Sequence, residues 1–188
     1  MNLVVGLGNP GRRYDGTPHN AGFRVVAELA RRVGEPLRAS ARLEAEVLKA
    51  DFEGRRVVFA RPLTYMNNSG AAVAAILRCN GMAPSDMIVV LDDADLEAGV
   101  LRIRPKGGSG GHRGLRSILE SVGTDAFVRV RLGIGRDPER DGLIEHVLRP
   151  LNGEAKTVFE EAVGKAADAV ACVLKDGAEA AMNRFNGK

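Results

Sequence analysis

Apolar residues along the chain form short continuous runs and stretches with helical spacing. The runs and the alternating stretches are typical of strands, whereas apolar positions three and four residues apart indicate helices. The expected strands are 1–7, 43–52, 55–60, 86–91, 100–104 and 127–135. The expected helices are 20–33, 71–79, 112–122, 152–174 and 177–185. Between the second and third strands, Glu53-Gly54 is the kind of pair that closes a two-residue hairpin.

The order of these elements predicts the fold class. Strands and helices alternate in the first two thirds of the chain, one hairpin adds antiparallel pairing, and the chain ends in helices. This order is typical of an α/β protein, and we expect a three-layer sandwich with a twisted mixed β-sheet flanked by helices. A chain of 188 residues suits one domain, 1–188, with the helices from about 152 packed on the same core.

Composition adds little beyond an ordinary globular protein. Hydrophobic residues make up 45% and charged residues 27% of the chain. No apolar run has the length of a membrane span, and the N-terminus has the pattern of a strand rather than a signal peptide. Cys79 and Cys172 fall in helical patterns, where buried core thiols are expected. We therefore expect a cytoplasmic protein that does not contact membranes.

Charge is distributed unevenly. The segment 102–136 holds eight basic and two acidic residues, a net charge of +6, whereas 86–97 holds five acids and no base. This juxtaposition indicates a polyanionic partner near a carboxylate-containing site. A solvated face with internal ion pairs is the alternative for any single arginine.

The first twenty residues contain a glycine motif with two readings. Gly6, Gly8 and Gly11 follow a strand with the spacing of a dinucleotide-binding fingerprint. That fingerprint needs a helix beginning within the glycine turn, but residues 12–18 form a turn-rich stretch without apolar periodicity. We therefore expect the glycines to shape a turn that presents Asn9, and the following loop to place His19 at the start of a helix, with Asn20 as its cap.

His19 and Asp92 form the best candidate for a catalytic pair. A histidine at a helix N-terminus meets a positive potential that favours neutral imidazole, the form a general base requires. Asp92 ends a buried strand, where open α/β sheets place ligands. A carboxylate bonded to one imidazole nitrogen leaves the other free to accept a proton. His112, at the start of another helix, could cap that helix or touch a substrate.

Other chemistries are open from the residues alone. Ser109 in Gly107–Gly111 matches a nucleophile elbow, and the acids following the strand at 86–91 could hold magnesium. The glycine loop with Arg104 and Lys106 beside it suits a phosphate. Loop residues suited to base stacking and amide hydrogen bonding are Tyr14, Tyr65, Asn9 and Asn67.

Taken together, the motifs resemble those of bacterial peptidyl-tRNA hydrolase over nearly the whole chain. They are Gly6–Gly11, Tyr14, Thr17–Gly22, Tyr65–Gly70, Asp92–Leu96 and Gly107–Leu115, in the family's order and spacing. The resemblance implies a monomeric, cytoplasmic catalytic domain that cleaves the ester between a peptide and the 3′ ribose of tRNA, without metal or cofactor. A non-catalytic RNA-binding relative, or a serine esterase using Ser109, is the alternative.

The resemblance also implies roles for individual residues. His19 would be the general base and Asp92 its support, and Asn9 would distinguish blocked from free aminoacyl groups. Tyr14, Tyr65 and Asn67 would contact the acceptor end of the substrate. The side chains suited to tRNA phosphates are Arg104, Lys106, Arg129 and Arg131.

One position departs from the family pattern. The family usually has Asn after the histidine of Gly-Gly-His, whereas this chain has Arg113. Arginine offers only donors, so it would bind a substrate carbonyl or a phosphate rather than a peptide N–H. A lid role for the polar connection 137–148 is left open by the sequence.

Overall fold

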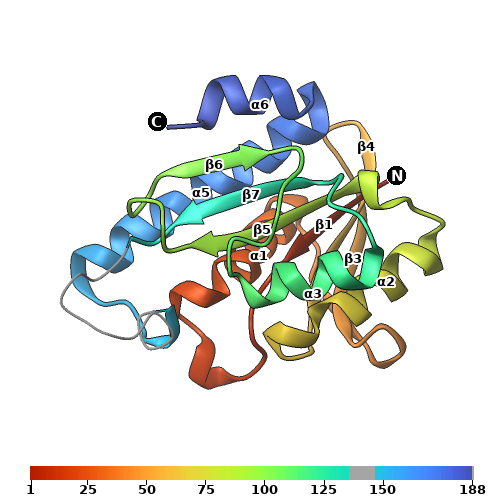
Figure 1. The fold of residues 1–188 in the computed structure, drawn as a ribbon, viewed down its shortest axis with the longest axis horizontal. Coiled ribbons are helices and arrows are strands. Elements are labelled where there is room, and N and C mark those ends of the chain that lie inside the picture. Colours follow the sequence, from red (N-terminus) through yellow and green to blue (C-terminus); the bar gives the residue numbers. More distant parts are fainter. Residues whose placement is uncertain (136–146, 188) are drawn as a thin grey trace.

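The computed structural model describes residues 1–135 and 147–187, which form one mixed β-sheet with helices on both faces (Figure 1). The strands are β1 (Asn2–Gly6), β2 (Arg38–Ser40), β3 (Ala45–Phe52), β4 (Arg55–Pro62), β5 (Met87–Asp93), β6 (Leu101–Arg104) and β7 (Val128–Gly133). They lie in the order β2-β3-β4-β1-β5-β7-β6. The β4-β1-β5-β7 core is parallel, and β2, β3 and β6 add antiparallel pairings. The predicted α/β class is confirmed.

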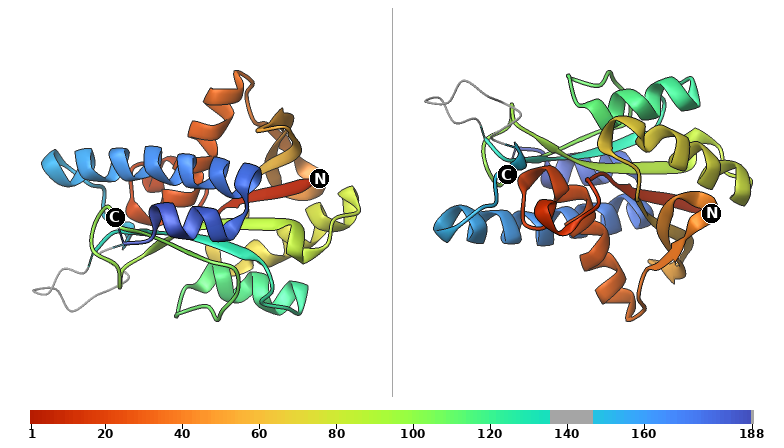
Figure 2. Two further views of the ribbon diagram at one scale, coloured as in Figure 1. Left: turned by 90° about the horizontal axis from the view of Figure 1, so that it is seen from above. Right: turned by 90° about the horizontal axis from the view of Figure 1, so that it is seen from below.

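Helices cover the two faces of the sheet to give three layers (Figure 2). One face packs against α1 (Ala21–Val33), α5 (Gly153–Asp176) and α6 (Ala178–Phe185), and the other against α2 (Ser69–Asn80) and α3 (Arg113–Val122). Each face of the sheet has its own hydrophobic core, and neighbouring side chains of β1 point into opposite ones. Val4 packs on the side of α1 and α5, whereas Leu3 and Val5 pack on the side of α2 and α3. This division follows from the two-residue period of a strand.

The predicted hairpin with a two-residue turn at Glu53-Gly54 is confirmed. Phe52 pairs with Arg55, and both residues between them have positive φ, 50° at Glu53 and 72° at Gly54. Positive φ at both central positions is the geometry of the turn that matches strand twist. The predicted strand at 43–52 begins two residues later, because residues 41–43 form a 3₁₀ turn.

Two details differ from the prediction. The three-residue edge strand β2 is absent from the expected elements, because so short a segment carries no periodicity. Cys79 is exposed rather than buried, with Arg42 donating a 3.0 Å hydrogen bond to its sulfur, whereas Cys172 is buried as expected.

Among the described residues, no helix has both the length and the apolar character of a membrane span.

Close packing between β1 and α1 positions the residues that precede the helix. A Cβ on Gly6 would lie 2.1 Å from the Gly22 carbonyl oxygen, and one on Gly22 would lie 2.2 Å from the Leu7 nitrogen. Only glycine permits this approach. Gly6 and Gly22 therefore bring the start of α1 onto the end of β1, which places His19 at the carboxyl edge of the parallel strands.

Candidate active site

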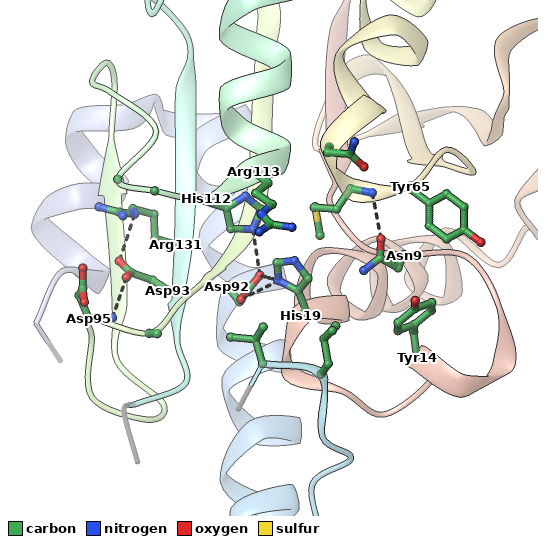
Figure 3. A pocket seen from close by; sticks show the side chains of 17 residues that line it. Asn9, Tyr14, His19, Tyr65, Asp92, Asp93, Asp95, His112, Arg113 and Arg131 are labelled. Atoms are coloured by element: carbon green, nitrogen blue, oxygen red, sulfur yellow. Dashed lines mark hydrogen bonds and ion pairs between the residues drawn. The ribbon is translucent and has the colours of Figure 1, made fainter. Parts of the chain in front are cut away.

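A cavity of about 490 Å³ opens at this edge of the sheet (Figure 3). The carboxyl ends of parallel strands are where open α/β sheets bind ligands. The seven residues predicted from sequence to act in catalysis or to bind substrate all line the cavity: Asn9, Tyr14, His19, Tyr65, Asn67, Asp92 and Arg113. Segments distant in sequence thus supply one site.

His19 and Asp92 are in direct contact. His19 lies in a 3₁₀ turn, Pro18–Asn20, immediately before α1, and Asp92 is the penultimate residue of β5. The Nδ1 atom of His19 is 3.0 Å from both carboxylate oxygens of Asp92. Because an ionised carboxylate only accepts, Nδ1 carries the proton and Nε2 keeps its lone pair. The pair therefore has the arrangement of a general base with an orienting carboxylate.

His112 bonds to the same carboxylate, a link that the sequence did not reveal. Its Nε2 lies 3.1 Å from Asp92 Oδ1, and its Nδ1 accepts the Leu115 N–H at 3.2 Å as the N-cap of α3. An Nδ1 that accepts cannot carry a proton, so the ring is neutral and Nε2 donates to Asp92. The expected capping role of His112 is confirmed. Asp92 thus accepts from two imidazoles.

These two donors keep Asp92 charged inside the protein. Burial on its own would raise the pKa of Asp92, whose side chain is only 4% exposed. The hydrogen bonds from His112 and His19 outweigh burial and hold the pKa well below its usual range. An ionised Asp92 can stabilise positive charge on His19 as the imidazole takes up a proton.

Asn9 is held by three hydrogen bonds. Its backbone N–H donates to Asn20 Oδ1 at 2.8 Å, and its carbonyl accepts from Asn20 Nδ2 at 3.1 Å. Its side-chain Oδ1 accepts the Met66 N–H at 2.9 Å, which fixes the amide orientation. Asn20 therefore braces the Asn9 turn. It occupies the N-cap position of α1, as predicted, but its side chain makes no capping hydrogen bond there. With its oxygen engaged, Asn9 can offer its Nδ2 donors to a ligand in the cavity it lines.

The two tyrosines lie on either side of Asn9 in Figure 3. Tyr65 is 58% exposed, and Tyr14 is half-buried with the Arg13 guanidinium 4.6 Å from its ring centroid. Asn67 and Arg113 are also exposed, each at the N-terminal side of a helix. The two tyrosine rings and the donor groups of Asn67 and Arg113 thus border the cavity and are not buried in the hydrophobic core.

The four basic residues predicted to contact phosphate lie in different environments. Arg104 and Lys106 are exposed at and just beyond the end of the strand β6, whereas Arg131 lines the cavity and pairs with Asp93 at 3.0 Å. Arg129 is 2% exposed and donates to the carbonyl of Gly107, and at 3.1 Å to that of Asp125. The expectation of a phosphate contact at Arg129 conflicts with this burial. The guanidinium instead anchors the glycine loop.

The alternatives from sequence find less support. Asp92 is engaged by imidazoles, whereas Asp93 pairs with Arg131 and accepts the Asp95 N–H at 3.0 Å, so these carboxylates face different partners. Ser109 is not among the residues that line the cavity. Neither a magnesium site built from Asp92, Asp93 and Asp95 nor a serine nucleophile is favoured.

Other contributions to the site were missing from the sequence-based prediction. The Met66 backbone donor for Asn9 depends on the tertiary approach of two loops, which no local pattern encodes. Val147 and Leu148 add an apolar wall, and they follow the segment 136–146 that lies outside the described residues. The lid role considered for 137–148 falls mostly in that segment.

Comparison with known proteins shows the family to which this chain belongs. The family model of peptidyl-tRNA hydrolase matches residues 3–188. The chain belongs to the peptidyl-tRNA hydrolase family. It is 49% identical to peptidyl-tRNA hydrolase of Rubrobacter xylanophilus, covering 98% of this chain and 99% of that protein. Identity to the Desulforudis audaxviator enzyme is 47%, over 99% of this chain and 93% of that one.

Solved structures of the family share the fold. A crystal structure of peptidyl-tRNA hydrolase from Acinetobacter baumannii is similar with a TM-score of 0.92 and 34% identity. The similarity covers 100% of this chain and 95% of that one. The sequence-based assignment to this family is therefore confirmed.

Proposed function

We propose that this protein hydrolyses the ester between a peptide, or an N-blocked amino acid, and the 3′ ribose of tRNA. This activity would recycle peptidyl-tRNA released from ribosomes. The observation that carries the proposal is His19, oriented by buried Asp92 with its second nitrogen available beside a cavity. Membership of the peptidyl-tRNA hydrolase family supports the same substrate class.

In the proposed mechanism His19 Nε2 takes a proton from water as the water oxygen attacks the ester carbonyl. The resulting imidazolium is stabilised by Asp92, and its proton then passes to the departing ribose oxygen. General-base assistance of this kind contributes about 10²- to 10⁴-fold in rate. The 3′ ester of tRNA is an activated ester, so no metal or other cofactor is required in this scheme.

The remaining residues of the cavity would position the substrate. Asn9 Nδ2 would donate to a carbonyl of a blocked aminoacyl group, since its Oδ1 accepts the Met66 N–H, and Asn67 and Arg113 would offer further donors. Tyr14 and Tyr65 would pack against the unpaired acceptor end. Backbone N–H groups near Asn67 or in the glycine loop would meet the developing oxyanion.

Binding of the tRNA backbone would fall to the exposed basic residues. Arg104 and Lys106 have exposed side chains, whereas Arg131 lines the cavity but already pairs with Asp93. Cations in such positions attract phosphate without reading sequence. We propose a cytoplasmic monomer acting on tRNA in this way.

A direct test incubates the protein with N-blocked aminoacyl-tRNA and with the unblocked form, with and without chelator. We expect hydrolysis of the blocked form in both conditions. His19→Ala should abolish turnover and keep tRNA binding, whereas Ser109→Ala should keep both. Turnover by His19→Ala would refute the general-base assignment, and binding without turnover by the wild type would favour a non-catalytic RNA-binding relative.

A further inference from the structure

The histidine pair and its shared carboxylate have the geometry of a metal-ligand set. One ring nitrogen of His19, one ring nitrogen of His112 and a carboxylate oxygen of Asp92 all lie within 4.8 Å of one another. The two nitrogen-to-oxygen distances are 3.0 and 3.1 Å. Bonds of about 2.0–2.1 Å in a tetrahedral zinc site place neighbouring ligand atoms about 3.3 Å apart. The two nitrogen-to-oxygen distances are therefore within a few tenths of an ångström of those in a zinc site.

We propose that His19, Asp92 and His112 form a binding site for a zinc-like transition-metal cation, and that the bound ion inhibits the enzyme. The inhibitory consequence rests on the proposed function, whereas binding of the ion does not. The cation would replace the two hydrogen bonds that now join the imidazoles to Asp92. The site thus has two exclusive states, one bridged by protons and one bridged by metal.

The chemistry of the three side chains selects the class of ion. Two imidazole nitrogens and one carboxylate suit Zn²⁺ and neighbouring transition metals, whereas Mg²⁺ prefers oxygen ligands and retained water. All three side chains are largely buried, with exposures of 14% at His19, 4% at Asp92 and 8% at His112. The adjoining cavity provides an entry path and room for a water at a fourth position.

Inhibition follows from the position of one proton. Neutral His19 now carries its proton on Nδ1 and offers Nε2 as the base. A metal on Nδ1 leaves a neutral ring only if that proton moves to Nε2, which removes the lone pair needed to accept a proton from water. The ion therefore blocks catalysis without filling the substrate cavity.

The cost of metal binding falls on His112. A metal on Nε2 moves its proton to Nδ1, where it faces the Leu115 N–H that the ring now accepts. One capping hydrogen bond of α3 is lost, and each ring retains a single proton. The Leu115 amide consequently reports on metal binding at His112.

The experiment titrates untagged protein with Zn²⁺ in a calorimeter and follows Co²⁺ by its visible absorption. His112→Asn is the decisive variant, because asparagine is a good N-cap that can keep the helix start while removing an imidazole ligand. Cys79→Ser is the control, because the exposed Cys79 thiol is another potential zinc ligand. Hydrolysis of N-blocked aminoacyl-tRNA is measured alongside, with the ion and after chelator.

We expect the wild-type chain to bind one Zn²⁺. His112→Asn should bind Zn²⁺ at least about tenfold more weakly than the wild type, because loss of even an outer-shell partner of a metal ligand lowers metal affinity about 10- to 100-fold. Cys79→Ser should bind like the wild type. Zinc should suppress turnover, and chelator should restore it. Unchanged binding in His112→Asn, or loss of binding in Cys79→Ser, would overturn the site. Binding without inhibition would overturn its regulatory consequence, whereas an inactive metal-free wild type would instead refute the proposed function.

Discussion

Replacing Asp92 with asparagine should convert His19 to the wrong tautomer. His112 Nε2 can only donate, because Leu115 occupies the other ring nitrogen, so the oxygen of the introduced amide must turn toward His112. His19 Nδ1 is 3.0 Å from both carboxylate oxygens, so it would then face the new amide nitrogen. That group donates, which forces Nδ1 to accept and moves the proton of His19 to Nε2. The general base is lost although the geometry is nearly unchanged.

The magnitude follows from what the base contributes. Loss of general-base catalysis costs about 10²- to 10⁴-fold, and a wrong tautomer in a serine protease triad costs about 10⁴-fold. We therefore expect kcat to fall about 10³- to 10⁴-fold in Asp92→Asn, which corresponds to about 4–5.5 kcal/mol of transition-state stabilisation. Single-turnover hydrolysis of N-blocked aminoacyl-tRNA isolates the chemical step, and a binding assay checks that tRNA affinity is retained.

The neighbouring aspartate supplies the matched control. Asp93 is also buried, but its carboxylate pairs with Arg131 and accepts the backbone N–H of Asp95 instead of contacting an imidazole. Asp93→Asn removes the same charge one residue away, and its kcat should stay within about tenfold of the wild type, far above the general-base loss. Comparable kcat losses in both variants would show that charge in this region, rather than the tautomer, governs the rate. A kcat of Asp92→Asn within about tenfold of wild type would refute the tautomer argument.

Further predictions concern substrate contacts and stability. Arg113→Asn should keep activity and change KM more than kcat, and a large loss of kcat in steady-state assays would assign Arg113 a transition-state role. Lys106→Ala should weaken tRNA binding and reduce the slope of log affinity against log salt by about 0.7–0.9 if it contacts one phosphate; an unchanged slope would contradict that contact. Hydrogen bonds from Arg31 and then Arg32 lower the pKa of Glu28 from 4.5 to about 2. Because the folded pKa is depressed, these bonds stabilise the protein above pH 4.5 and lose their effect as the pH falls toward 2. Glu28→Gln should therefore lower the free energy of unfolding by about 0.5–1 kcal/mol at neutral pH, and urea titrations should show this difference shrinking at acid pH.

Local pattern was enough to predict most of the fold. The long periodic helices, the hairpin and the buried strand before Asp92 each depend on residues close in sequence, and their positions agree with the structure to within about two or three residues, as helix and strand ends usually do. The edge strand β2 was missed because three residues show no period. The exposure of Cys79 was missed because a helix that is apolar on most sides leaves its outward face undetermined.

The residues that line the cavity and the contact of His19 with Asp92 were predictable from sequence, but two other connections of the site were not. Motif residues that resemble a known family line one cavity together, as expected for side chains at the ends of parallel strands. The bonds from His112 to Asp92 and from Met66 to Asn9 join segments 20 and 57 residues apart. Such contacts depend on how α3 and the loop before α2 pack against the sheet, and the spacing of motifs along the sequence does not specify that packing.

The basic segment shows how a charge count can overstate a binding surface. Arg129 and Arg131 are two residues apart on β7, so both side chains leave the same face of the sheet, toward the glycine loop. Arg129 is buried against the Gly107 carbonyl, and a Cβ on Gly110 would lie 2.7 Å from the Arg131 guanidinium. Arg129 therefore fixes the loop that leads to His112, and Arg131 lies against it while neutralising Asp93 beside Asp92. Part of the positive charge of this segment thus builds the site, and only the exposed remainder is available to a polyanion.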